Sequence, residues 1–105
     1  GKNLVLRYQL TDMKITIPKR WDGKWRMVIF DIPDKKRQAS NALREHLRRL
    51  GFYQLQKSVF VHPFPCEKEI EFLRQFFEIA PHVHLGFIDL VDKEPHELLK
   101  SHFDL

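Results

Sequence analysis

Six basic side chains between positions 35 and 49 form a pattern that could contact phosphate groups. They are Lys35, Lys36, Arg37, Arg44, Arg48 and Arg49. Arg37, Arg44 and Arg48 are spaced by seven and four residues, so on a helix they share one face. Such side chains neutralise backbone phosphates without reading bases, which predicts weak, sequence-independent binding to DNA or RNA. The alternative is that they face water or pair with acids of a second helix, namely Glu67, Glu71 and Glu78.

Histidine and cysteine offer a weaker case for chemistry. His82 and His84 would lie on one face of a strand, a spacing that can chelate a transition metal. No third ligand is apparent in the sequence, so ordinary surface or half-buried histidines are the stronger interpretation. Cys66 is expected to be a small buried hydrophobe near a helix start.

Composition limits the class of protein. The chain has 105 residues, 43% of them hydrophobic and 30% charged, which is typical of one globular domain. The single cysteine excludes an internal disulfide, and there is neither a signal peptide nor a run of roughly 18 apolar residues for a membrane span. These features predict a cytoplasmic protein without a membrane partner.

Charge is distributed unevenly along the chain. Residues 1–65 hold 14 Lys and Arg against five acids, whereas residues 66–105 hold four against nine. The first part therefore carries about +9 and the second about −5, and only the first can attract phosphate. The alternative is a mixed-charge surface that simply keeps the domain soluble.

Hydrophobic patterning predicts the elements that must position these residues. A strand is expected where apolar residues end at a proline, and a helix where they recur every three or four residues up to a glycine. The expected strands are Trp25–Ile32, Phe52–Gln56, Ser58–His62 and His82–Val91. The expected helices are Asp34–Leu50, with Asp34 as N-cap, and Cys66–Ile79, while the tail Glu94–Phe103 suits a short helix or a strand.

This order of elements defines the expected fold. Strand, helix, two strands, helix, strand is the ferredoxin-like βαββαβ arrangement, an α+β sandwich with two helices on one face of a four-stranded antiparallel sheet. We assign it to residues 25–105. Residues 1–24 are expected to be a linker or a short edge strand from an upstream domain, and an opening on Gly-Lys rather than Met favours a piece of a longer protein.

The expected fold leaves one sheet face without cover. Trp25, Met27 and Ile29 would lie on one face of the first strand, and the opposite face is also mostly apolar. The uncovered face must meet the residues before the strand, the tail, or a second copy. We favour a second copy, because homodimers are the commonest way to hide such a face.

Three motifs carry a family resemblance. Phe30–Pro33 reads Phe-Asp-Ile-Pro, Leu50–Phe52 reads Leu-Gly-Phe, and Gln56–Phe60 reads Gln-Lys-Ser-Val-Phe. Together they resemble the central domain of PaaX-type transcriptional regulators, which is similar to the CRISPR-associated Cas-two (Cas2) endonucleases. The segment Trp21–Trp25, which reads Trp-Asp-Gly-Lys-Trp, resembles the PaaX-type regulators rather than the Cas-two enzymes. The resemblance implies a homodimeric module of a DNA-binding regulator.

Asp31 acquires a possible role only through this resemblance. In Cas-two enzymes the aspartate that ends the first strand sits near its dimer mate and holds a divalent metal, which would make Asp31 a catalytic and Mg²⁺-binding residue. The alternative is that Asp31 caps a strand end or pairs with a nearby Lys or Arg. Three functions therefore remain: a regulator's dimerisation module, a magnesium-dependent endonuclease, or a non-catalytic scaffold that bridges proteins, which exposed aromatics around Phe72 and Phe76 would favour.

Overall fold

Four strands form one antiparallel sheet in the order β2-β3-β1-β4. The computed structural model describes residues 2–105, and their side chains from residue 6 onward. The strands are β1 (Trp25–Phe30), β2 (Tyr53–Gln56), β3 (Val59–His62) and β4 (Val83–Ile88). β1 is central, and its Val28 faces Phe60 of β3 on one side and Leu85 of β4 on the other. This confirms the predicted α+β, ferredoxin-like sandwich.

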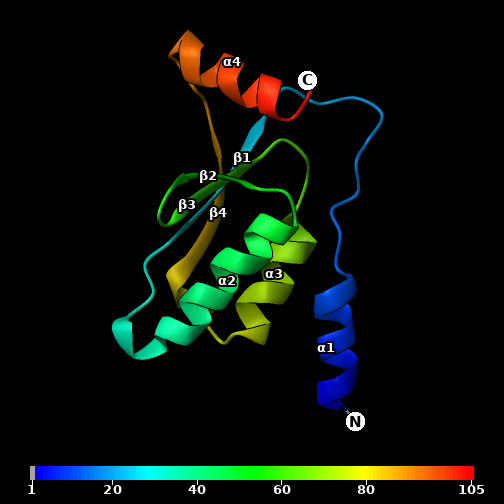
Figure 1. The fold of residues 1–105 in the computed structure, drawn as a ribbon, viewed down its shortest axis with the longest axis vertical. Helices are drawn as coiled ribbons and strands as arrows, with labels where there is room; N and C mark the ends of the chain where they lie inside the picture. The colour runs from blue at the N-terminus through cyan, green and yellow to red at the C-terminus, as the bar shows by residue number, and fades with distance from the viewer. Residues whose placement is uncertain (1) are drawn as a thin grey trace.

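Two helices cover one face of the sheet. α2 (Arg37–Arg49) follows a short 3-10 turn, Asp34–Lys36, and α3 (Glu67–Phe76) precedes a second one, Ala80–His82. The two helices lie side by side against the sheet (Figure 1). α1 (Lys2–Asp12) and α4 (Lys93–His102) lie outside this pair.

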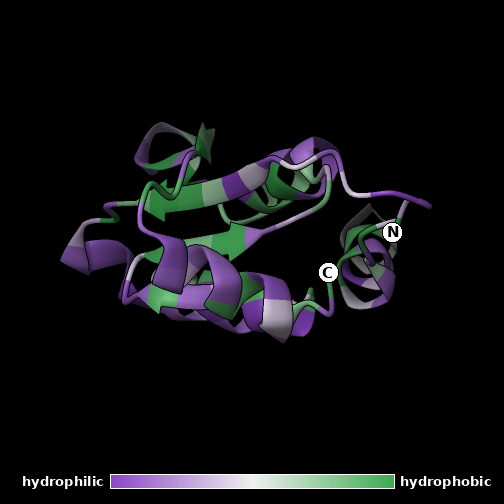
Figure 2. Ribbon diagram, turned by 90° about the horizontal axis from the view of Figure 1, so that it is seen from above, coloured by the Kyte–Doolittle hydropathy of each residue, from purple (hydrophilic) through white to green (hydrophobic). Residues whose placement is uncertain are grey.

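The core between the helices and the sheet is apolar. Leu43 and Leu47 of α2 and Leu73 of α3 are fully buried, as their helical spacing predicted. The rings of Phe30 and Phe60 stack beneath them with centroids 6.1 Å apart. Figure 2 shows the strands mostly hydrophobic and the helices carrying long hydrophilic stretches.

Of the two ends of α2, only the C-terminal end matches the prediction. Gly51 has φ +93°, and its N–H and that of Phe52 donate to carbonyls of the last helical turn, at 3.0 Å each, which closes the helix as expected. The predicted cap is wrong. Asp34 opens the 3-10 turn after Pro33 and caps nothing, because α2 starts at Arg37 behind Lys36, which makes no side-chain cap.

The residues before β1 contain a helix, and not the short edge strand that was one of the two expectations for them. Lys2–Asp12 is a helix, and the extended segment that follows it pairs with no strand; Gly1 lies outside the described residues. Leu6 and Leu10 are four residues apart, a helical spacing that the strand interpretation overlooked. Leu10, Met13 and Ile15 pack against the main core, and these contacts hold the segment.

The tail resolves as helix α4, which packs on the second face of the sheet. Leu99 of α4 forms a buried cluster there with Trp25 of β1 and Val61 of β3. Figure 1 shows α4 at one end of the sheet, away from α2 and α3. Among residues 2–105, none of the helices combines the length and the apolar character that a membrane span requires.

Candidate functional site

Asp31 lies directly after β1 with its side chain exposed. Its backbone N–H donates to the carbonyl of His82 at 2.9 Å, which ties the end of β1 to the start of β4. In the described part of the chain, no group of three or more His, Cys, Asp or Glu side chains could hold a metal ion. One carboxylate does not make a magnesium centre, so a second copy's aspartate would have to complete the Mg²⁺ site.

Arg37, Arg44 and Arg48 lie on helix α2, where the sequence placed them, but the predicted basic side chains differ in how they are held. Arg44 is half-buried and turned toward the β2–β3 turn. It donates to the Lys57 carbonyl at 2.9 Å, to Asn41 Oδ1 at 3.2 Å and to Ser58 Oγ at 3.3 Å. Its guanidinium also lies over the Phe30 ring, 5.2 Å from the centroid. Arg44 is therefore a fixed group and not a mobile surface charge.

Three other members of the predicted set already have partners. Arg48 donates to Gln54 Oε1 at 3.1 Å, Arg49 pairs with Glu45 at 3.3 Å, and Lys36 Nζ donates to a backbone carbonyl at 2.7 Å. In the described residues, none of these side chains pairs with a carboxylate of α3. Glu71, one of the acids predicted as a partner, pairs with Arg74 at 2.9 Å instead.

Lys35 and Arg37 are exposed, and in the described chain neither side chain makes a contact of this kind. Arg37, but not Lys35, lines a pocket beside the first turns of α2, together with the fixed Arg44. We call it the basic pocket, and its volume is about 330 Å³. Its lining residues are Ile32, Pro33, Asp34, Arg37, Ser40, Asn41, Arg44 and Lys57. Lys57 was missed from the sequence, because a turn residue gives no signal of which helix it will face. The structure thus brings Arg37 and Arg44 together with Lys57, and leaves Arg48 and Arg49 outside.

The predicted dimer face is partly covered by the chain itself. Trp25 is only 2% exposed, because α4 packs over it. Its indole N–H donates to His96 Nδ1 of α4 at 3.0 Å, and its ring lies 6.0 Å from that of Phe103. Of the three candidates for the face, Trp25 therefore belongs to the protomer's own core.

The other part of that face is open. Ile29 is 41% exposed, and Met27 is partly exposed. Ile29 pairs with Val59 of β3 and with His84 of β4, so the open area spans the three adjacent strands. We call Met27, Ile29 and Val59 the open apolar row.

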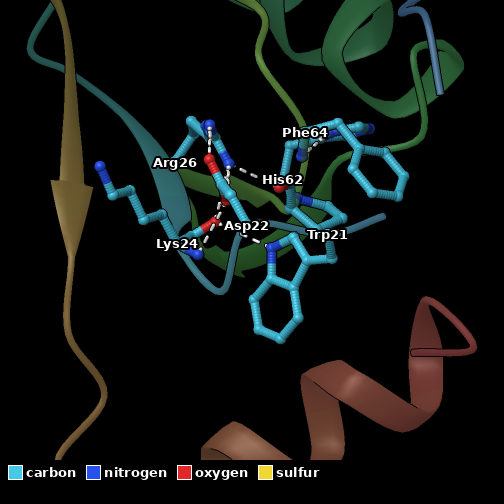
Figure 3. Close-up of polar contacts among 7 residues, drawn as sticks. Trp21, Asp22, Lys24, Arg26, His62 and Phe64 are labelled. Atoms are coloured by element: carbon cyan, nitrogen blue, oxygen red, sulfur yellow. Dashed lines mark hydrogen bonds and ion pairs between the residues drawn. The ribbon is translucent and has the colours of Figure 1, made fainter. Parts of the chain in front are cut away.

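The segment before β1 forms a closing turn that sequence reasoning missed (Figure 3). Gly23 has φ +82°, which lets the Lys24 N–H donate to Asp22 Oδ1 at 3.0 Å. The Asp22 carboxylate accepts hydrogen bonds from both terminal nitrogens of Arg26, at 2.9 Å and 2.6 Å. The available signal was an acid four residues before an arginine, with a glycine between them.

Arg26 is buried, with a side chain only 5% exposed, and also donates to the Pro63 carbonyl at 2.7 Å. The hydrogen bonds from Arg26 hold the pKa of Asp22 down at about 2, below its ordinary 3.8, and Asp22 raises the pKa of Arg26. Trp21 completes the turn by packing on Trp25 with centroids 4.7 Å apart. The Trp21–Trp25 segment, which resembles PaaX-type proteins, is thus a structural turn that packs against the end of the sheet.

His62 lies beside this turn and is buried among aromatic rings. Burial lowers its pKa to about 4, and its Nδ1 accepts a hydrogen bond from the Phe64 N–H at 3.1 Å. The rings of Phe52 and Phe103 lie 4.8 Å and 5.6 Å from it. His62 is therefore a neutral core residue at ordinary pH.

The remaining candidates are structural or isolated. Cys66 is buried as predicted, and burial raises the pKa of its thiol to about 12. His84 is exposed, while His82 belongs to the 3-10 turn before β4 and not to the strand. Phe72 and Phe76 are half-buried and stack on each other with ring centroids 5.8 Å apart, so neither is the fully exposed aromatic that would favour a protein scaffold.

The topology and these surfaces define the class: a ferredoxin-like α+β domain with a second sheet face that its own tail covers at one end. A family model, that of the PaaX protein central Cas2-like domain, matches residues 18–99. The chain belongs to this family. The match confirms the resemblance drawn from the motifs and extends it through most of α4. No curated protein and no solved structure matches the chain.

Proposed function

We propose that this chain is the dimer-forming module of a PaaX-like, DNA-binding transcription regulator of the cytoplasm. Two copies meet through the open apolar row, Met27, Ile29 and Val59. Membership of the PaaX central-domain family supports the regulator part of the proposal. The open apolar row supports the dimer.

The row is the observation that carries the proposal. A single exposed Leu or Ile needs no explanation, since much of any protein surface is apolar. Here Ile29 and Val59 lie side by side on the two middle strands of the sheet, positions that are normally covered by another layer. α4 supplies that layer only at the end near Trp25.

A twofold contact suits this arrangement. In a twofold dimer the same patch meets itself, so two copies of the row would cover each other. A stable contact needs about 800 Å² from each partner, so the row must form its centre and neighbouring groups its rim. His84 on β4, which is exposed beside Ile29, is one such rim group.

Gel filtration of two matched variants tests the proposal. Ile29→Lys places a charge at the centre of the contact, where it would be buried without a partner. Ile17→Lys makes the same change at a side chain 74% exposed in the segment before β1, outside the sheet. We expect the parent chain and Ile17→Lys to elute as dimers and Ile29→Lys as a monomer. Equal elution of the two variants would overturn the proposed interface.

A further inference from the structure

We propose that the basic pocket binds one phosphate group, held by Arg37, Arg44 and Lys57. This site goes beyond dimer formation. It rests on the proposed DNA-associated function only for the source of the phosphate, which is either the backbone of a nucleic acid or a free phosphorylated molecule.

The pocket has the charge and the room for such a group. Three cations line it against one carboxylate, Asp34, which leaves an excess of positive charge for a doubly charged anion. Its volume of about 330 Å³ is roughly ten times the share of one water, about 30 Å³, so a phosphate enters with part of its hydration shell. Ser40 and Asn41 add polar side chains to the wall.

Arg44 is already oriented for this task. A guanidinium has five N–H donors, and Arg44 uses three of them on Lys57, Asn41 and Ser58, which leaves two for a ligand. Its stacking on Phe30 fixes the plane of the group. A fixed guanidinium plane suits phosphate oxygens, and little conformational entropy is lost on binding.

Arg37 and Lys57 supply charge that no ion pair in the described chain neutralises. Both are exposed, and within residues 2–105 neither side chain makes a hydrogen bond or an ion pair. They approach the pocket from different elements, Arg37 from the first turn of α2 and Lys57 from the β2–β3 turn.

The test measures binding of two probes to the full chain at low salt. Inorganic pyrophosphate represents a free phosphate, and a short DNA duplex of arbitrary sequence represents the backbone. The variants are Arg37→Gln and Lys57→Gln. Arg49→Gln is the matched control, since it removes the same charge from the same helix outside the basic pocket. Arg44 is left in place because it holds the β2–β3 turn.

We expect Arg37→Gln and Lys57→Gln each to weaken binding by about tenfold, whereas Arg49→Gln changes it less than about twofold. With the duplex, each lost contact should also lower the logarithmic salt slope by about 0.9. Loss of pyrophosphate binding in the same variants identifies a free phosphate as the ligand, and a response to the duplex alone identifies the backbone.

Two results would overturn the proposal: equal weakening by all three variants, which indicates diffuse charge attraction, or no binding of either probe at low salt. Repeating the titration in Ile29→Lys separates this site from the dimer. The pocket lies within one protomer, so binding to each chain should persist in a monomer.

Discussion

The two ends of the sheet are built in opposite ways. At the closed end, α4 and the turn before β1 cover Trp25, and Arg26 and His62 are buried with hydrogen-bond partners. At the open end, Ile29 is exposed on the second face, and the basic pocket lies beside the end of β1. Strand β1 therefore begins in a buried core and ends beside two exposed surfaces, the open apolar row and the basic pocket.

This difference separates stability from function. Most polar groups at the closed end find their partners inside the protomer, so changing them should destabilise the chain without a specific effect on binding. At the open end, Ile29 is uncovered, and Arg37 and Lys57 lack such partners in the described structure. Changing these residues should affect association and ligand binding while the fold survives.

Trp25→Ala should have the largest effect. Removing this buried ring at the closed end should lower the free energy of unfolding by about 3–5 kcal/mol. Ile29→Ala, at the open end, should change it by less than about 0.5 kcal/mol when measured at a concentration where the chain is monomeric. Denaturant unfolding monitors both. Similar losses of unfolding free energy in the two variants would contradict the difference between the two ends of the sheet.

Should Trp25→Ala fail to fold, Trp25→Phe keeps a ring and removes only the indole N–H. Its cost should be smaller, because the lost hydrogen bond to His96 is worth about 1 kcal/mol and the smaller ring fills less of the site.

His62 should make the closed end sensitive to mild acid. Its folded-state pKa of about 4 lies below the ordinary 6.5, so the unfolded chain takes up a proton that the folded chain refuses. Its stabilising contribution is full above pH 6.5 and is lost as the pH falls to about 4, a loss of about 3 kcal/mol. Urea unfolding across this range, compared with His62→Gln, measures it. An identical pH dependence in the variant would contradict the assignment.

Asp22 should add a smaller effect at lower pH. Its pKa is lowered from 3.8 to about 2, so its contribution is present above pH 3.8 and disappears as the pH falls through about 2. The side chain is 45% exposed, and solvent screening limits the contribution to about 1 kcal/mol. Asp22→Asn should therefore be less stable than the parent near neutral pH and equal to it near pH 2. A constant difference would show that the charge of Asp22 is irrelevant.

Asp31→Asn should have the smallest effect. Its side chain is exposed at the open end, so the free energy of unfolding should change by less than about 0.5 kcal/mol and the dimer should persist. We expect the chain with Mg²⁺ or Mn²⁺ to cut neither DNA nor RNA. Cleavage that disappears in Asp31→Asn while the dimer remains would establish the endonuclease alternative instead.

The fold was predictable where hydrophobic periodicity was strong. Leu43 and Leu47 marked the buried face of α2, and the apolar run ending at Pro33 marked β1. α1 was missed because Leu6 and Leu10 are too few to distinguish a helix from a strand. The sequence did not decide between helix and strand for the tail, since its Leu99 is buried in a cluster with Trp25 and Val61, which are far away in sequence.

The candidate site was predictable only in part, for a similar reason. Helical spacing placed Arg37 and Arg44 on one face, because that relation is local. The hydrogen bonds of Arg44 and the position of Lys57 depend on where the β2–β3 turn packs, which no local pattern encodes. The burial of Trp25 under α4 likewise follows from tertiary packing, and it moved the expected dimer contact toward Ile29.

The molecular mass of the unmodified chain in solution tests the central claim most directly. One chain has a mass of 12.7 kDa. If the open apolar row pairs two copies, light scattering at micromolar concentration should give twice that mass, and Ile29→Lys should give the mass of a single chain. A parent chain that scatters as a monomer throughout that concentration range would contradict the account.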